Sequence, residues 1–302
     1  MDTRSDKERI LALKKENDAI ILAHNYQEGP VQDVADLVGD SLELARAAAL
    51  MEGQVIVFCG VDFMAETAAI LSPSKTVVLP AGDACCPMAQ MVTPEEIRSA
   101  RTLFPSAAVV SYVNTSAGVK AESDICCTSA NAVKVVNSLD EDQVLFVPDR
   151  NLAHYVSRHS KKEIIPWEGF CYVHDRITRE DVASARTQHM AARVIVHPEC
   201  RPEVIDAADF VESTSGMIRR VRDEPAEEFV IGTEIGILYR LEEECPGKRC
   251  YPLSGSAVCV NMKKTSLSLV ENALLTLGPR VTVPEPVAGR ARKAITRMLE
   301  IP

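Results

Sequence analysis

Short β-branched and apolar runs alternate with stretches of helical periodicity along the chain. Three such runs begin at Ile20, Val109 and Val194, and each leads through polar residues into a helical pattern. An uninterrupted apolar run is typical of a strand that is buried on both faces of a parallel sheet. Strands that alternate with helices in this way indicate an α/β fold with parallel sheets and helices on both faces.

The spacing of these elements repeats three times, with offsets of 88 and 85 residues between the copies. Each copy has a polar strand end, an aspartate, a hydroxyl residue five positions later and an apolar second strand. These positions are His24, Tyr112 and His197; Asp36, Asp124 and Asp209; Ser41, Ser129 and Thr214; and Phe58, Phe146 and Ile231. Self-similarity at a fixed period indicates repeated structural units.

A capping-box pattern precedes each first strand and predicts the start of a helix there. The patterns are Ser5-Asp-Lys-Glu8, Thr93-Pro-Glu-Glu96 and Thr178-Arg-Glu-Asp181. We therefore expect three analogous α/β domains, which comprise residues 1–86 with a helical tail at 260–302, residues 87–171 and residues 172–259. Similar units in one compact chain tend to pack about a pseudo-three-fold axis.

One cysteine closes each copy, five to seven residues after a proline in a third apolar run. These residues are Cys86, Cys171 and Cys259, and equivalent loops meet near the expected axis. Three thiolates without C-x₂₋₄-C pairs favour a 4Fe–4S cluster, whose fourth iron stays open as a Lewis acid. A zinc site and unligated core cysteines are the alternatives.

Cys85 adjoins the first of these positions, and side chains alternate in direction along an extended loop, so we expect it to point elsewhere. The remaining cysteines have no equivalents in the other copies, and we interpret them as small core or surface residues. They are Cys59, Cys126, Cys127, Cys200, Cys245 and Cys250.

The repeated hydroxyls lie where helices are expected to begin, and helix N-termini bind anions. Simple N-capping is the alternative. The strand ends that precede them lie at the carboxyl edge of a parallel sheet, where ligands bind. We expect a small ligand with several negative charges, such as a dicarboxylate or a phosphate ester. The candidate contacts are His24, Ser41, Tyr112, Val113, Asn114, Ser129, His197, Pro198, Glu199 and Thr214.

Three residues are candidates for acid–base chemistry. Glu199 is a general base or acid if burial shifts its pKa, and a surface carboxylate otherwise. Tyr26 shares the strand face of His24 and is either a proton donor or a half-buried loop residue. We interpret His174, three residues after Cys171, as an ordinary hydrogen-bonded histidine.

Composition narrows the function classes. The net charge of −10 argues against nucleic-acid binding, which requires a basic face. The charged N-terminus lacks the apolar region of a signal peptide, and no apolar run approaches the length of a membrane span. We therefore expect a cytoplasmic protein in which thiols stay reduced.

At these residues the sequence resembles the quinolinate synthase family over nearly its whole length. The stretches that carry the resemblance are AHNYQ, DVADLVGDSLELAR, GVDFMAE, CPMA, YVNTSA, DICCTSANAV, PDRNLA, the Cys171-x-x-His174 pair, VIVHPEC, STSGM, FVIGTEIGILYRL and AVCVNMKKT. The resemblance implies three αβα domains about a pseudo-three-fold axis. It also implies one 4Fe–4S cluster per chain, held by Cys86, Cys171 and Cys259.

The resemblance further implies a reaction: iminoaspartate condenses with dihydroxyacetone phosphate to quinolinate, with loss of phosphate and water, in de novo NAD synthesis. The family's substrate contacts map to the candidate residues above, and Glu199, His24 and Tyr26 are placed for the proton transfers. A functional link to an iminoaspartate-producing enzyme is expected. The rival interpretations are another cluster-dependent hydro-lyase and a non-catalytic binding protein for phosphate or dicarboxylates.

Overall fold

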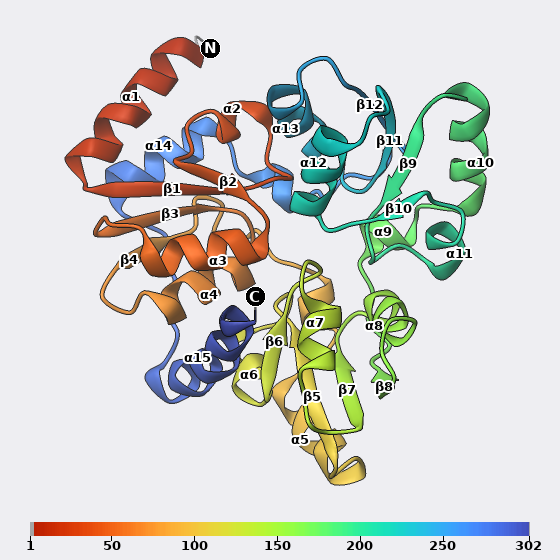
Figure 1. Ribbon diagram of the computed structural model, residues 1–302. Coiled ribbons are helices and arrows are strands. Elements are labelled where there is room, and N and C mark those ends of the chain that lie inside the picture. The colour runs from red at the N-terminus through yellow and green to blue at the C-terminus, as the bar shows by residue number, and fades with distance from the viewer. Residues whose placement is uncertain (1–2, 302) are drawn as a thin grey trace.

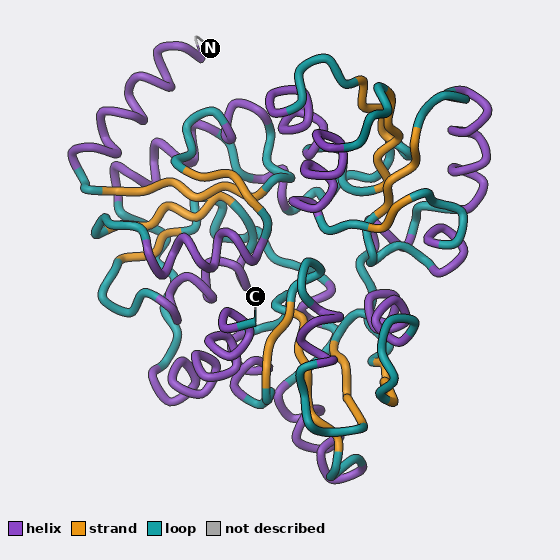
Figure 2. The backbone as a smooth tube through the Cα atoms, in the orientation of Figure 1, coloured by secondary structure: helices purple, strands orange, loops and turns teal. Residues whose placement is uncertain are grey.

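A computed structural model describes residues 3–301. It contains three separate four-stranded sheets, and every neighbouring pair of strands within them is parallel. Figure 1 shows three lobes around a shared centre, and Figure 2 shows helices on both sides of each sheet. The predicted α/β class with parallel sheets is confirmed.

The first sheet has the order β2-β1-β3-β4. Its strands are β1 (Ala19–His24), β2 (Leu37–Gly39), β3 (Val55–Cys59) and β4 (Thr76–Val78). The helices around it are α1 (Thr3–Glu16), α2 (Gly29–Gln32), α3 (Ser41–Leu50) and α4 (Asp62–Leu71). A 3₁₀ turn, η1 (Met88–Gln90), leads into the second unit.

The second sheet has the order β6-β5-β7-β8. Its strands are β5 (Ala107–Tyr112), β6 (Ile125–Cys127), β7 (Gln143–Val147) and β8 (Glu163–Pro166). Its helices are α5 (Pro94–Leu103), α6 (Ala117–Ala121), α7 (Ala132–Asn137) and α8 (Arg150–Ser157).

The third sheet has the order β10-β9-β11-β12. Its strands are β9 (Arg193–Val196), β10 (Phe210–Val211), β11 (Glu228–Gly232) and β12 (Arg249–Pro252). Its helices are α9 (Tyr172–Asp175), α10 (Arg179–Gln188), α11 (Pro202–Ile205), α12 (Thr214–Asp223) and α13 (Ile237–Glu244). In all three sheets the spatial order of the strands is therefore second, first, third and fourth in sequence, as expected for a repeated unit. The domain boundaries and the pseudo-three-fold axis stay predictions.

The repeated aspartates explain part of the sequence pattern. Asp36, Asp124 and Asp209 each accept the backbone N–H of a residue in the first strand of their sheet, at 2.8, 2.7 and 2.7 Å. The carboxylate satisfies an amide that the short neighbouring strand does not pair, and a buried amide without a partner is costly. These residues serve the sheets rather than the ligand.

Two of the three predicted helix starts are confirmed. Thr93 and Thr178 form complete capping boxes with Glu96 and Asp181. The first prediction is wrong, because Ser5 lies inside α1, which begins at Thr3. The sequence pattern at Ser5 therefore resembles the other two, but it does not mark the start of its helix.

The C-terminal tail connects two of the lobes. Helix α14 (Leu267–Thr276) packs on α1, whereas α15 (Glu285–Glu300) packs against α4, α6 and β6 (Figure 1). Between them, residues 279–281 bind the edge strand β4 through the bridge Val78–Arg280. Small residues at 288, 291 and 294 on the buried face of α15 allow its close approach.

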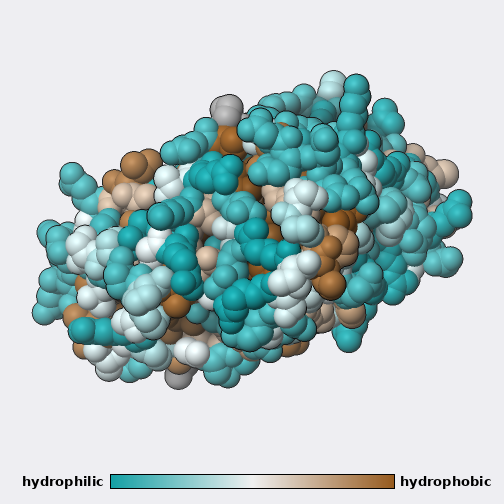
Figure 3. Space-filling model, turned by 90° about the horizontal axis from the view of Figure 1, so that it is seen from below, coloured by the Kyte–Doolittle hydropathy of each residue, from teal (hydrophilic) through white to brown (hydrophobic). Residues whose placement is uncertain are grey.

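The longest helix among the described residues, α15, has 16 residues. No helix there combines the length and apolar character that a membrane crossing requires. The face in Figure 3 is mainly hydrophilic, with apolar residues scattered among polar ones. Scattered exposed apolar residues are normal for a folded protein.

Candidate active site

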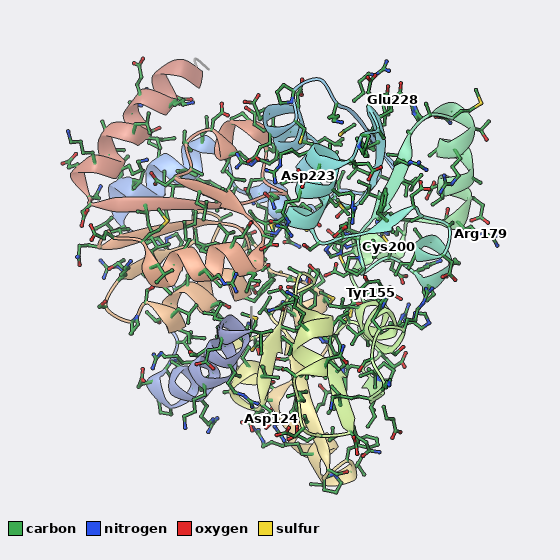
Figure 4. All side chains as sticks on the ribbon, viewed as in Figure 1. Asp124, Tyr155, Arg179, Cys200, Asp223 and Glu228 are labelled. Atoms are coloured by element: carbon green, nitrogen blue, oxygen red, sulfur yellow. The ribbon has the colours of Figure 1, made fainter. Side chains whose placement is uncertain are left out.

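A cavity at the centre of the molecule is lined by residues from all three units, in the region that Figure 4 shows filled with side chains. It brings together all of the predicted site residues except Val113 and Pro198. Those that line it are His24, Tyr26, Ser41, Cys86, Tyr112, Asn114, Ser129, Cys171, His197, Glu199, Thr214 and Cys259. Val113 lines a smaller neighbouring pocket with Ser41 and Phe63. Pro198 follows β9 beside His197, outside the set that lines the cavity.

The three matched cysteines come from loops of different units and line this one cavity. Cys85 lines it too, so the expectation that this side chain points elsewhere is wrong; its Sγ lies 3.9 Å from Asn261 Oδ1. In contrast, Cys200, labelled in Figure 4, is fully buried and its thiol faces the carbonyl oxygen of Gly232 at 3.6 Å. It is a core residue, as predicted.

The spacing of the sulfurs bears on which metal they suit. Within residues 3–301, the one group of three side chains with candidate ligand atoms within 4.8 Å of one another is Cys171, His174 and Glu199. The three matched sulfurs therefore do not all lie within 4.8 Å of one another, whereas the thiolates of a tetrahedral zinc site lie about 3.8 Å apart. A larger group with several metal atoms suits this donor set better.

The protonation of these thiols bears on whether they bind a metal at all. Burial raises the pKa of Cys86, Cys171 and Cys259, and charge repulsion from Cys259 and Cys86 adds to it at Cys86 and Cys171 respectively. Thiolates in such surroundings require a bound cation, and binding releases their protons. The donor set fits a thiolate-bound metal group.

The three hydroxyls occupy related but unequal places. Ser41 and Thr214 are the first residues of α3 and α12, whose caps are Asp40 and Ser213. Capping therefore does not account for them, and the alternative of simple N-caps is wrong. Ser129 lies in a turn three residues before α7 begins at Ala132, so the predicted helix start there is wrong. All three line the cavity.

His24 and His197 are equivalent in position and in hydrogen bonding. In each, Nδ1 accepts the backbone N–H of the residue two positions later, at 3.2 Å from Tyr26 N and 3.3 Å from Glu199 N. This bond leaves the hydrogen of the neutral ring on Nε2. Burial lowers the pKa of both rings to about 3. They therefore act as neutral hydrogen-bond donors rather than as bases.

Glu199 is ionised at neutral pH. Burial alone would raise its pKa, but His174 and His197, together with a hydrogen bond from Tyr112, outweigh burial and lower it to about 2. Its Oε2 lies 2.7 Å from His174 Nδ1. A carboxylate of such low basicity is a poor proton acceptor, so the geometry favours charge stabilisation over the direct base role considered from the sequence.

A chain of polar contacts runs from Tyr26 to Glu199. The hydroxyl of Tyr26 lies 2.6 Å from Thr233 Oγ1, which lies 2.8 Å from His174 Nε2. His174 is therefore more than an ordinary hydrogen-bonded histidine, and Thr233 was not identified from the sequence. The signal for Thr233 is its place directly after β11, at the carboxyl edge where the other site residues lie. Such a chain can carry a proton between the cavity and His174.

The two neutral histidines predict a pH dependence of stability. The unfolded chain binds a proton at each ring near pH 6.5, whereas the folded pKa is about 3, so stability falls as the pH drops below about 6.5. We expect a loss of about 2 kcal/mol per ring at pH 5. The lowered pKa of Glu199 contributes stability that is lost at lower pH, as the pH falls from about 4.5 to about 2.

Urea unfolding at pH 7 and pH 5 measures this loss. The double variant His24→Asn/His197→Asn removes both rings and should show a smaller difference between the two pH values. An equal difference in the variant and the parent would contradict the assignment of the effect to these rings.

Known proteins are similar in sequence to this chain over nearly its whole length. A family model described as Quinolinate synthetase A protein matches residues 8–300. The quinolinate synthase of Methanoregula boonei is 68% identical over 300 residues, which cover 99% of each chain. Those of Desulforudis audaxviator and Methanothermobacter thermautotrophicus are 55% and 54% identical, over 97% of each chain. The chain therefore belongs to the quinolinate synthetase A family, which is a family of enzymes.

Proposed function

We propose that this enzyme condenses iminoaspartate with dihydroxyacetone phosphate to quinolinate, with loss of phosphate and water, in de novo NAD biosynthesis. The observation that carries the proposal is the central cavity, where cysteines from three repeats meet anion-binding and proton-transferring groups. The relatives named quinolinate synthase match this chain over nearly their entire length. The overall reaction balances without an electron donor or acceptor.

The residues that hold the metal group in this proposal are Cys86, Cys171 and Cys259. The group would be one 4Fe–4S cluster, and its open iron would supply Lewis-acid chemistry when bound. A multi-iron group is favoured over zinc because the three sulfurs do not all lie within 4.8 Å of one another.

Substrate binding would use donors from each unit. Ser41 and Thr214 lie at the N-termini of α3 and α12, where backbone N–H groups and the helix dipole favour carboxylate or phosphate. The Nε2–H groups of His24 and His197 add neutral donors. Ser129, Tyr112, Val113, Asn114 and Pro198 complete the set mapped from the family. Because the site is buried, these hydrogen bonds act in a medium that strengthens them.

Proton transfer would follow the chain from Tyr26 through Thr233 to His174. Burial and the Glu199 charge raise the pKa of Tyr26, so its hydroxyl stays protonated at neutral pH and can donate a hydrogen bond within the chain. The Glu199 carboxylate stabilises His174 when this ring takes a proton. Carbon–carbon bond formation and loss of water both require such transfers.

The test is product formation by protein purified without air. Iminoaspartate generated in the assay and dihydroxyacetone phosphate should yield quinolinate and phosphate in equal amounts, measured by chromatography and a phosphate assay. A cluster-containing protein that makes no quinolinate would overturn the proposal in favour of another hydro-lyase. A colourless, metal-free protein that only binds phosphate would favour the binding-protein alternative.

The source of iminoaspartate is a further part of the proposal. Imines hydrolyse in water, so the proposed reaction requires an enzyme that produces this substrate nearby. We also propose a cytoplasmic location with soluble small-molecule substrates, because a reducing compartment keeps the three proposed ligand thiols free of disulfides.

A further inference from the structure

Each unit of the chain contains an acidic residue that binds the backbone of its matched cysteine. Asp62 Oδ1, Asp149 Oδ2 and Glu234 Oε1 accept the backbone N–H of Cys86, Cys171 and Cys259, at 3.2, 3.2 and 3.1 Å. The same contact therefore occurs three times, although the sequence separations differ (24, 22 and 25 residues). Chance contacts would not recur at the three positions that share one proposed role.

Each carboxylate is itself fixed to the start of a helix. Asp62 is the first residue of α4 and also accepts the N–H of Phe63 at 2.8 Å. Asp149 caps α8 through the N–H of Leu152 at 2.8 Å. Glu234 accepts the N–H of Gly236 at 2.7 Å, just before α13. A rigid element of each unit thus carries the acceptor.

The opposite side of each cysteine is fixed as well. The carbonyl oxygens of Cys86, Cys171 and Cys259 accept N–H groups three or four residues later, from Ala89, Asp175 and Lys263, at 3.0, 2.8 and 3.2 Å. Each cysteine therefore begins a helical turn, with its N–H bound to a carboxylate and its carbonyl bound to the turn. Only the side-chain torsion is left to set the direction of the sulfur.

We propose that Asp62, Asp149 and Glu234 are positioning residues that hold the three cysteine loops in the geometry that retains the metal group. The inference rests on the proposed role of the cysteines as ligands. Outer-shell partners of this kind orient metal ligands, and their loss typically weakens binding about 10–100-fold. The carboxylates also occupy the cysteine N–H groups, which are then unable to donate hydrogen bonds to sulfur.

The same contact distinguishes Cys86 from Cys85. The amide that binds Asp62 belongs to Cys86, as the equivalent amides belong to Cys171 and Cys259. Cys85 lines the cavity without sharing this pattern. The repeat of the backbone geometry therefore supports Cys86 as the first ligand.

The test compares acceptor-free and acceptor-retaining variants by iron retention. Asp62→Ala and Glu234→Ala, each loaded with iron and sulfide without air, should release iron to a chelator at least tenfold faster than the parent. Asp62→Asn and Glu234→Gln keep an oxygen acceptor and should restore the parent's release rate and its visible absorption spectrum. Asp36→Ala removes a carboxylate–amide bond that involves none of the cysteines and serves as the control, with an unchanged rate expected.

Three results would overturn the inference. The first is that both alanine variants release iron at the parent's rate. The second is that the alanine and amide variants release iron equally fast. The third is that the Asp36→Ala control releases iron as fast as the alanine variants of Asp62 and Glu234. Circular dichroism checks that each variant is folded. If Asp62→Ala does not fold, the comparison of Glu234→Ala with Glu234→Gln tests the inference. Because the measurement is iron release, failure to make quinolinate would leave its outcome unaffected, whereas a parent that binds no iron would contradict the cluster proposal itself.

Discussion

Cys171→Ala is expected to abolish both the brown colour of the anaerobically purified protein and the formation of quinolinate. The physical reason is that two thiolates do not hold a cluster that normally requires three or four. The side chain that is lost is small and directly precedes the short helix α9, and circular dichroism checks that the variant is folded. Absorption spectra, iron content and product formation measure the result.

The matched control is Cys250→Ala. Cys250 lies in β12, has no equivalent in the other units and is outside the set that lines the cavity. Its replacement should leave iron content and activity within about twofold of the parent. Activity in a colourless Cys171→Ala protein would refute the proposed role of the cluster.

Glu199→Gln is expected to lower kcat by about 10²–10⁴-fold, the usual range for loss of acid–base catalysis. The amide keeps the size of the side chain but removes the charge that stabilises His174 on taking a proton. Iron content should be unchanged, because Glu199 is not a proposed ligand. Steady-state quinolinate formation, with the iron content of the same preparation, measures the effect.

Glu203→Gln provides the comparison for this variant. Glu203 lies in α11, four residues along the chain, and lines a separate outer cleft. It should have parental activity. A Glu199→Gln enzyme with parental kcat would show that the polar chain from Tyr26 to Glu199 does not carry the proton.

The sequence predicts the fold class and the cavity residues because repetition makes equivalent positions visible. His24 and His197 are recognisable at offsets that hold along the chain, and the cavity brings them together with Glu199 and the three cysteines. The offsets do not reveal how the copies differ. Ser129 lies outside its helix because α7 begins later than the corresponding helices.

Three features of the site were beyond sequence reasoning for physical reasons. Thr233 and His174 become neighbours only when the third unit folds, since 59 residues separate them along the chain. The direction of the Glu199 pKa depends on which charges surround it, and burial alone predicts the opposite shift. The carboxylates that bind the cysteines are not recognisable from the repeat spacing, because Asp62 is displaced by one position relative to Asp149 and Glu234.

The packing of α15 against α4, α6 and β6 has a consequence for biosynthesis. The helix that joins the first two units follows all of their strands in the sequence, so these strands are synthesised before the helix that packs against both units. Cys259 also emerges late, after the other two matched cysteines. A nascent chain paused before Cys259 therefore lacks both the third matched thiol and the helix that joins the lobes.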